Sequence, residues 1–329
     1  MRAIPSPSLS RHLIIPFAAC SAEGWLPALQ ALAQGNMRHL SQLLQGMKQV
    51  ETDTQDANSL SPPHERALAR ALGLANQETP DGLIPWAAQD AAEQQLPGRD
   101  KAWAWMTPCH WAMGHLHATL TDPAALELRE DESRALLAVM QPYFETDGIT
   151  LHYLRPGRWL AEGDIFRSLP TASLDRVLAR NVDAWLPDAP NAAPLRRLQN
   201  EMQMLLYTHP MNDAREARRQ LPVNSFWVSG TGALPAVGLP AATADLSEPR
   251  SLAQAVFKED WAAYAEAWST LDAGEIAQLL ARQRAGETVQ LTLCGERSAQ
   301  TFVSHRPSLR ARISNLFTPM RFVDVLEQL

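Results

Sequence analysis

The chain has 329 residues, 46% of them hydrophobic, and a formal net charge of −7. This hydrophobic fraction excludes wholesale disorder, the length favours two domains over one core, and the acidic balance excludes a broad, sequence-independent affinity for nucleic acid. The three cysteines form no CxxC pair, which suits a reducing compartment. No apolar run approaches the ~20 residues that a helix needs to cross a bilayer. The sequence therefore predicts a cytoplasmic protein without membrane association.

The first hundred residues predict a buried strand followed by helices. Residues 12–18 are apolar and partly β-branched, as expected of a short buried strand. Leucines at helical spacing predict a helix over 26–47. A polar linker over 51–63 leads into another helix with Ser61 at its N-cap. Residues 76–100 are polar and rich in turn residues, which predicts a domain boundary.

The middle of the chain begins with a change in composition. The aromatic-rich run over 103–117 predicts a strand. Carboxylates in a first turn predict a helix from about Glu130, and two extended runs around Pro-Gly predict a hairpin over 148–160. Helices are expected over 171–182 and, strongly amphipathic, over 195–207.

The last third of the chain returns to apolar strands. Residues 223–232 predict a buried strand that ends in a glycine turn, and 288–294 predict another. The stretch 249–284 is mainly helical in pattern, and residues 320–329 predict a terminal helix. Strands separated by helices imply a substantially parallel sheet flanked by helices.

Four polar side chains are expected to converge near the end of the strand over 223–232. They are His209, Asn212, Arg215 and Asn224. In a doubly wound sheet, ligands usually bind at such strand ends. Alternatively, the His-Pro pair and the asparagines build a structural turn, because asparagine readily satisfies loop backbone. The residues alone leave both readings open.

The same segment carries a family resemblance. Residues 209–232 (HPMNDAREARRQLPVNSFWVSGTG) resemble a segment of archaeal-type cofactor-independent phosphoglycerate mutases that reads His-Pro-Val-Asn, a basic helix, Pro-Ala-Asn, and an apolar strand ending in Arg-Gly-x-Gly. The whole chain is similar to a bacterial family of phosphoglycerate mutase-like, or Rpf-type regulatory, proteins. The stretches typical of that family are 107–123, 171–187 and 195–210.

The resemblance implies the fold of the alkaline phosphatase superfamily. That fold is α/β, with a doubly wound, mostly parallel sheet and an inserted smaller α+β domain. On this chain the sheet domain would comprise residues 1–100 and 225–329, and the inserted domain residues 101–224.

The chemistry of that superfamily uses two divalent metal ions, bound by Asp and His, and a Ser or Thr nucleophile at a helix N-terminus. This sequence departs from the pattern. No Asp follows the first strand, Asp260 has no histidine after it, and the strand over 288–294 is followed by Glu296 and Arg297 instead of an Asp-His pair. No histidine occurs between His209 and His305. The sequence therefore predicts that the metal site is lost.

Two weaker candidates for chemistry remain. Ser61, before a helix, could be a nucleophile, or a plain N-cap serine. A metal could be held by Cys109, His110, His115 and His117, since His-x-His on a strand puts both rings on one face. The surrounding tryptophans favour packed or hydrogen-bonded histidines instead.

The resemblance and the missing ligands together predict a non-catalytic binding or regulatory protein, a pseudoenzyme without cofactor. It would recognise a small anion or a protein partner through His209, Asn212, Arg215, Asn224 and Arg297, since a guanidinium can hold an anion without a metal. The alternative is a phosphoryl-transfer enzyme that depends on Mn, Mg or Zn.

Overall fold

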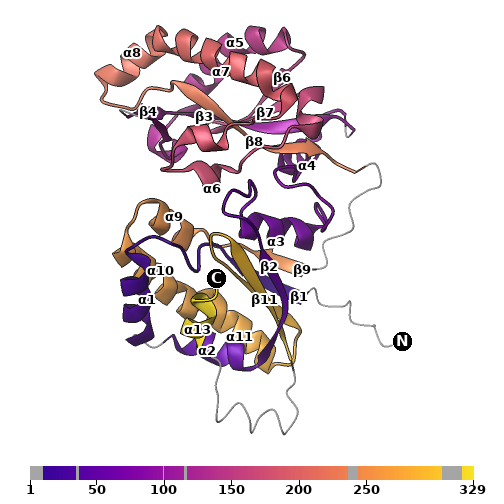
Figure 1. Ribbon diagram of the computed structural model, residues 1–329, viewed down its shortest axis with the longest axis vertical. Helices are drawn as coiled ribbons and strands as arrows, with labels where there is room; N and C mark the ends of the chain where they lie inside the picture. Colours follow the sequence, from indigo (N-terminus) through magenta and orange to yellow (C-terminus); the bar gives the residue numbers. More distant parts are fainter. Residues whose placement is uncertain (1–9, 35–36, 99, 115–116, 236–243, 306–320) are drawn as a thin grey trace. The chain divides into compact units, whose positions relative to one another are not determined.

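The computed structural model describes residues 10–34, 37–98, 100–114, 117–235, 244–305 and 321–329 (Figure 1). The chain forms two compact units. Unit 1 comprises Met1–Asn58, Pro62–Gly73 and Pro240–Leu329, and unit 2 comprises Ser59–Ser61 and Leu74–Leu239. Among the described residues, no helix has both the length and the apolar character needed to span a bilayer.

Unit 1 is built on a five-stranded sheet in the order β2-β11-β10-β1-β9. β1 pairs in parallel with both β9 and β10, whereas the pairs β10–β11 and β11–β2 are antiparallel. Its strands are β1 Ser10–Ile15, β2 Met47–Thr54, β9 Ala244–Ser247, β10 Val289–Cys294 and β11 Ser298–Ser304. Its helices are α1 Trp25–Gln34, α2 Arg38–Gln45, α3 Pro63–Leu72, α9 Ser251–Phe257, α10 Trp261–Leu271, the π-helical turn η5 Asp272–Ile276, α11 Ala277–Arg284 and α13 Phe322–Leu326.

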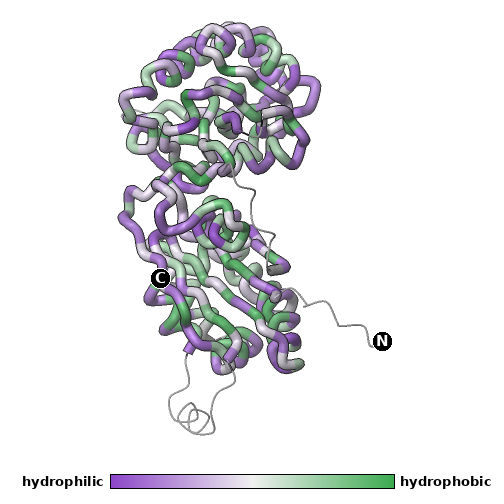
Figure 2. The backbone as a smooth tube through the Cα atoms, turned by 90° about the vertical axis from the view of Figure 1, so that its right-hand side faces the viewer, coloured by the Kyte–Doolittle hydropathy of each residue, from purple (hydrophilic) through white to green (hydrophobic). Residues whose placement is uncertain are grey.

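One face of this sheet packs on the main core of unit 1. Leu13 on β1 lies directly opposite Leu291 on β10, and both point into a core completed by α1, α2, α10, α11 and α13. Successive side chains of a strand point to opposite faces of the sheet, so His12 and Thr292 lie on the face opposite this core. In Figure 2, green stretches of the tube, that is hydrophobic segments, run through the interior of this unit.

α3 covers part of that opposite face, where it packs against β1, β10 and β11. An ion-pair network fixes it to β2: the Arg66 guanidinium donates two hydrogen bonds to Asp53, at 3.0 and 3.1 Å, and Arg70 lies 2.8 Å from the same carboxylate. Burial alone would raise the pKa of Asp53, but the hydrogen bonds and charges of the two arginines lower it below its ordinary value of 3.8. The helix is therefore held by both apolar and ionic contacts.

Unit 2 contains a four-stranded antiparallel sheet, β6-β7-β3-β8, and a small hairpin, β4-β5. Its strands are β3 Ala102–Cys109, β4 Trp111–Met113, β5 Ala118–Leu120, β6 Thr150–Arg155, β7 Arg158–Glu162 and β8 Ser225–Ala233. Its helices are α4 Trp86–Glu93, α5 Glu130–Glu145, α6 Leu174–Val177, α7 Ala193–Tyr207 and α8 Pro210–Ala217, with 3-10 turns η1 Pro123–Leu126, η2 Asp164–Ser168, η3 Val182–Trp185 and η4 Pro190–Ala192.

The two faces of the unit 2 sheet are covered by different helices. α5 and α7 pack on one face, with Phe144 of α5 in edge contact with Phe226 of β8. α4 packs on the other face, where the Trp86 and Trp105 rings stack with a centroid distance of 6.4 Å. The Trp105 indole N–H donates to Asp90 at 2.7 Å, so its polar atom is satisfied despite burial.

The chain is thus a mixed α/β protein, but the prediction of a mostly parallel, doubly wound sheet needs correction. Parallel pairing is limited to β10, β1 and β9, and the other strand pairs in the described residues are antiparallel. A short turn over 295–297 joins β10 to β11 and forces an antiparallel pair, and β2 extends the same edge.

The division by contacts also differs from the predicted boundaries of 1–100, 101–224 and 225–329. Residues 74–100 and 225–239 belong to unit 2. The reason is that β8 hydrogen-bonds to β3 along its length, and α4 packs on those two strands.

Several predicted elements are confirmed, namely the hairpin β6–β7, the helices α5 and α7, and the strands β8 and β10. The predicted helix over 26–47 is two helices, α1 and α2, and the linker over 51–63 begins inside strand β2. The predicted strand over 103–117 ends at Cys109 and is followed by the hairpin β4–β5. The helix expected over 171–182 is a single turn, α6.

Candidate functional site

The carboxyl ends of the parallel strands β1, β9 and β10 meet at one edge of the unit 1 sheet. In open α/β sheets this edge receives ligands. Three segments follow the strands there: residues 16–24 after β1, 248–250 after β9 and 295–297 after β10. The first turn of α3 contributes His64 to the same part of unit 1, because this side chain contacts both Phe17 and Arg250.

The loops after β1 and β10 are fastened together by Ser21 and Glu296. The backbone N–H of Ser21 donates to Glu296 Oε2 at 2.9 Å, and the Ser21 hydroxyl donates to the same oxygen. The Ala18 N–H donates to the carbonyl of Cys294 at 2.8 Å, which continues the β1–β10 pairing past the strand ends. The loop after β1 is therefore tied through Ser21 to the first acidic residue after β10.

Beyond β9, an imidazole, a guanidinium and a carboxylate form a compact cluster. His64 is only 1% exposed, and its Nε2 lies 3.1 Å from Arg250 NH1. Glu248 Oε1 lies 3.6 Å from the same guanidinium nitrogen and 4.0 Å from His64 Nε2. Because a guanidinium can only donate, His64 Nε2 accepts this hydrogen bond. The Arg250 side chain remains 36% exposed, so its outer edge is accessible.

Arg297 is the second cation at this edge. It lies in the turn between β10 and β11, where its carbonyl accepts a hydrogen bond from the Gln55 N–H at 3.0 Å. Its side chain is exposed and has no hydrogen-bond or ion-pair partner among the residues that the structure describes. The guanidinium is thus available for a ligand.

The resemblance to phosphoglycerate mutases implies two divalent ions at such an edge, and the donors of unit 1 do not fit such a pair. Two dications need several uncommitted carboxylates and imidazoles. Here the Glu296 carboxylate accepts from Ser21, and the Nε2 atom of His64 accepts from Arg250. The two guanidinium groups, of Arg250 and Arg297, would also repel dications. We therefore assign no step to a metal pair.

Arg215, predicted to bind a ligand, instead lies at the centre of a buried network in unit 2. It is 0% exposed. Its guanidinium donates to Glu132 at 2.7 Å, to the carbonyl of Leu221 at 2.8 Å and to the carbonyl of Leu126. Arg218 donates to the other oxygen of Glu132 at 2.5 Å. These contacts join α8 to α5 and leave Arg215 no surface for a ligand.

Asn212, His209 and Asn224 also bond to backbone groups of unit 2. The amide of the buried Asn212 donates to the carbonyls of Leu206 and Val223, both at 2.8 Å, and accepts from the Val223 N–H at 2.9 Å. His209 Nδ1 accepts from the N–H of Met211 and so caps α8. Asn224 bonds to the N–H and the carbonyl of Trp111. Of the two readings of this segment, these contacts favour the structural turn.

The candidate metal ligands of unit 2 are dispersed. Cys109 is fully buried at the end of β3, and burial raises the pKa of its thiol far above the ordinary range. His110 Nδ1 lies 2.9 Å from the carbonyl of Pro222, and His117 is exposed in the β4–β5 turn. His115 lies outside the described residues. Within the described part of the chain, these residues form no group of three ligand atoms.

Ser61, the candidate nucleophile, is buried, and its hydroxyl accepts from the Gly82 N–H at 3.0 Å. The residue at the N-cap of α3 is Pro62, not Ser61 as predicted. The Ser61 N–H donates to Asp81 at 2.9 Å. The serine therefore stabilises the segment that precedes α3.

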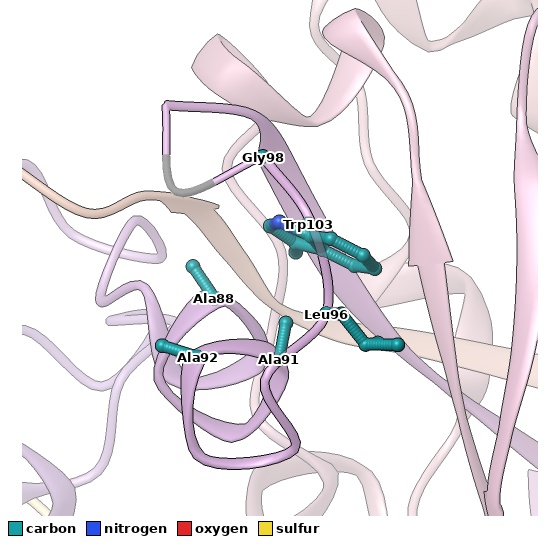
Figure 3. A pocket seen from close by; sticks show the side chains of 6 residues that line it. All are labelled: Ala88, Ala91, Ala92, Leu96, Gly98 and Trp103. Carbon is teal, nitrogen blue, oxygen red and sulfur yellow. The ribbon is translucent and has the colours of Figure 1, made fainter.

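A cavity of about 270 Å³ in unit 2 offers little chemistry. Figure 3 shows the Trp103 ring facing the alanines of α4 across this space. The lining comes from Ala88, Ala91, Ala92, Leu96, Gly98 and Trp103. It carries no charged side chain, and Trp103 offers a single indole N–H donor, so the cavity supplies neither a catalyst nor a strong anion site.

No pattern in the sequence points to the cluster around Arg250. Glu248 and Arg250 follow β9, a four-residue strand whose letters (ADLS) carry no clear strand pattern. His64 is 186 positions from Arg250 in the chain, so no local spacing connects them. The one available signal was a histidine in the first turn of a predicted helix.

No protein-family model and no curated protein matches the chain. Solved structures similar to it include the following two. The cofactor-independent phosphoglycerate mutase from Thermoplasma acidophilum DSM 1728 is 13% identical, with a TM-score of 0.36 and coverage of 97% of this chain and 100% of that chain. The PH0037 protein from Pyrococcus horikoshii is 12% identical, with a TM-score of 0.43 and coverage of 90% and 87%. Similarities this distant assign no activity, and membership of the Rpf-type family stays a prediction.

Proposed function

We propose that this protein binds a small anion, a phosphate ester or a carboxylate, at the carboxyl edge of β1, β9 and β10 in unit 1, and that it does not transfer phosphoryl groups. The observation that carries the proposal is the pair of accessible guanidinium groups at this edge. Arg297 follows β10 and Arg250 follows β9. Since β1 lies between these strands, their ends are roughly 10 Å apart.

The local chemistry suits anion recognition. A guanidinium forks onto phosphate or carboxylate with two parallel hydrogen bonds. Arg250 is oriented by the buried His64 and by Glu248, so less side-chain freedom is lost on binding. Arg297 is exposed and adjusts to the ligand. An acidic segment of a protein partner would use the same two groups.

A distant descent from the alkaline phosphatase superfamily is part of the proposal. It is supported by the parallel core β10-β1-β9 and by a second unit that interrupts the chain of the first. The committed donors at the edge support a regulatory pseudoenzyme over a working mutase. The three cysteines are buried and form no disulfide, which supports a cytoplasmic location.

Isothermal titration against inorganic phosphate, 2-phosphoglycerate and 3-phosphoglycerate tests the binding. Arg297→Gln and Arg250→Gln should each weaken the affinity by about tenfold or more, because a hydrogen bond to a charged group contributes ~1.5–3 kcal/mol. Arg284→Gln is the matched control, since α11 leads into the opposite, amino end of β10. The proposal is contradicted if none of these anions binds, or if Arg284→Gln weakens the affinity as much as the substitutions of Arg297 and Arg250 do.

The metal-dependent alternative has one observation in its favour. His64 and Glu65 are adjacent in the first turn of α3 and offer an imidazole and a carboxylate to a single ion. This alternative requires stoichiometric Mn, Mg or Zn in protein purified without chelator, and a transferase activity that disappears with chelator and with Ser61→Ala. Elemental analysis without a stoichiometric divalent ion excludes it.

A further inference from the structure

A polar cavity lies in unit 1, on the sheet face that α3 partly covers. Its volume is about 210 Å³, the space of roughly seven water molecules. His12 is three residues before the last residue of β1, so the cavity lies roughly 10 Å along the strand from the carboxyl edge. Its polar lining comes from β1, β2, α3, β10 and β11: His12, Glu51, Arg70, Gln290, Thr292 and Thr301.

Three of these side chains form a hydrogen-bonded chain across adjacent strands. His12 Nε2 lies 2.8 Å from Thr292 Oγ1, which in turn lies 2.9 Å from Thr301 Oγ1. The register pairs Thr292 with Thr301, and His12 lies opposite Gln290, the neighbour of Thr292 on the same face. The chain therefore crosses the floor of the cavity from β1 to β11.

At the His12 end of these hydrogen bonds, one ring nitrogen has no hydrogen-bond partner among the described residues. His12 is 5% exposed, and Thr292 is its sole hydrogen-bond partner among the described residues, which leaves Nδ1 unpartnered. Burial lowers the pKa of His12 to about 4, so the ring is neutral at pH 7. Nδ1 is not among the buried unpartnered polar atoms of the described residues, so it reaches the open space of the cavity, where a ligand can bond to it in place of water.

The hydrogen-bonded chain can run in either direction. With the proton on Nδ1, His12 donates to the ligand and Thr301 accepts from it. With the proton on Nε2, His12 accepts and Thr301 donates. In both cases the two ends present one donor and one acceptor. A ligand with hydroxyl groups satisfies both ends, because each hydroxyl is donor and acceptor, whereas an anion accepts only.

The charges around the cavity cancel. Arg70 lies 3.5 Å from Glu51 and 2.8 Å from Asp53, which also pairs with Arg66. Two arginines thus balance two carboxylates, and His12 adds no charge. A neutral ligand leaves these ion pairs intact, whereas an anion would compete with Glu51 for Arg70.

We propose that this cavity binds a small uncharged polyol or monosaccharide, held by His12 and Thr301, which Thr292 links. The site is independent of the anion site at the carboxyl edge, because the two share no residue. Its size admits a molecule of three to six carbons, estimated at roughly the volume of the seven waters displaced.

The proposal is tested by titrating the full-length protein with glycerol, ribose and glucose, and separately with inorganic phosphate. NMR follows the ring nitrogens of His12 and the backbone amides of Thr292 and Thr301 during each titration. The His12 ring signals are assigned with His12→Gln. We expect at least one polyol to shift these resonances together, and phosphate to leave them unchanged. The absence of a shift with all three polyols, or a shift with phosphate alone, overturns the proposal.

Thr292→Val breaks the hydrogen-bonded chain while nearly conserving side-chain shape. It should weaken polyol binding about tenfold, the effect of one lost hydrogen bond. Thr270→Val removes an exposed hydroxyl on α10 and serves as the control. Equal affinity of the two variants also overturns the proposal, and the wild-type titration remains decisive if Thr292→Val does not fold.

Discussion

The buried ion pair between Arg215 and Glu132 makes a quantitative prediction for Glu132→Gln. The substitution conserves shape but removes the charge that balances a guanidinium with 0% exposure. Loss of one partner of a buried pair costs roughly 3–5 kcal/mol. We expect about 3 kcal/mol, the lower end of that range, because the glutamine carbonyl still accepts from one arginine. The glutamine NH₂ group, however, faces an N–H donor of the second arginine, because Arg215 and Arg218 each donate to one of the two Glu132 carboxylate oxygens.

Glu130→Gln is the matched control. Glu130 belongs to the same first turn of α5, but it is exposed, and so is its partner Arg134. Losing this pair and part of the helix-dipole interaction should cost about 0.5 kcal/mol. Urea unfolding of the full chain, followed by tryptophan fluorescence, reports on unit 2 through Trp103, Trp159 and Trp227. If Glu132→Gln destabilises the protein no more than Glu130→Gln, the structural role of Arg215 is refuted.

Two further outcomes are expected from substitutions in the two units. His12 has a folded-state pKa of about 4 against an ordinary 6.5. As the pH falls, the unfolded chain therefore takes up a proton on His12 before the folded protein does, and the contribution of neutral His12 to the free energy of unfolding is complete above pH 6.5. That contribution is lost as the pH falls to about 4, and amounts to roughly 3 kcal/mol; unfolding of wild type and His12→Gln between these pH values measures it, and parallel curves would contradict it. Asn212→Ala removes three buried hydrogen bonds and should cost about 3 kcal/mol, whereas Asn200→Ala on the exposed face of α7 should change little; urea midpoints check both, and similar midpoints would mean that Asn212 is not a structural clamp.

Local sequence patterns predicted those helices and strands that are determined by their own residues. The hairpin β6–β7 follows from two extended runs around Pro156 and Gly157, and α5 follows from its acidic first turn. β2 was missed because its sequence, MKQVETDT, is mostly polar and most of its side chains are exposed. It becomes a strand through hydrogen bonds to β11, which begins 244 positions after β2 ends and which no local pattern reveals.

The candidate site residues show the same limit: residue type can be read locally, whereas hydrogen-bond partners lie far away in the sequence. His209, Asn212, Arg215 and Asn224 have side chains suited to ligand binding. Whether a guanidinium faces a ligand or the protein depends on its partner, and Glu132 is 83 positions from Arg215. Residue type predicted a polar cluster, and only the tertiary fold shows that these side chains bond to backbone groups and to Glu132.

The interrupted course of the chain through unit 1 has a consequence for synthesis on the ribosome. Unit 2 consists almost entirely of the continuous stretch Leu74–Leu239 and can fold as soon as it emerges. β1 is made first, but its two neighbours, β9 and β10, are made last. Until then the apolar side chains of β1, Leu13 and Ile15 among them, lack their partners. The nascent chain thus carries β1 without its sheet neighbours throughout the translation of unit 2.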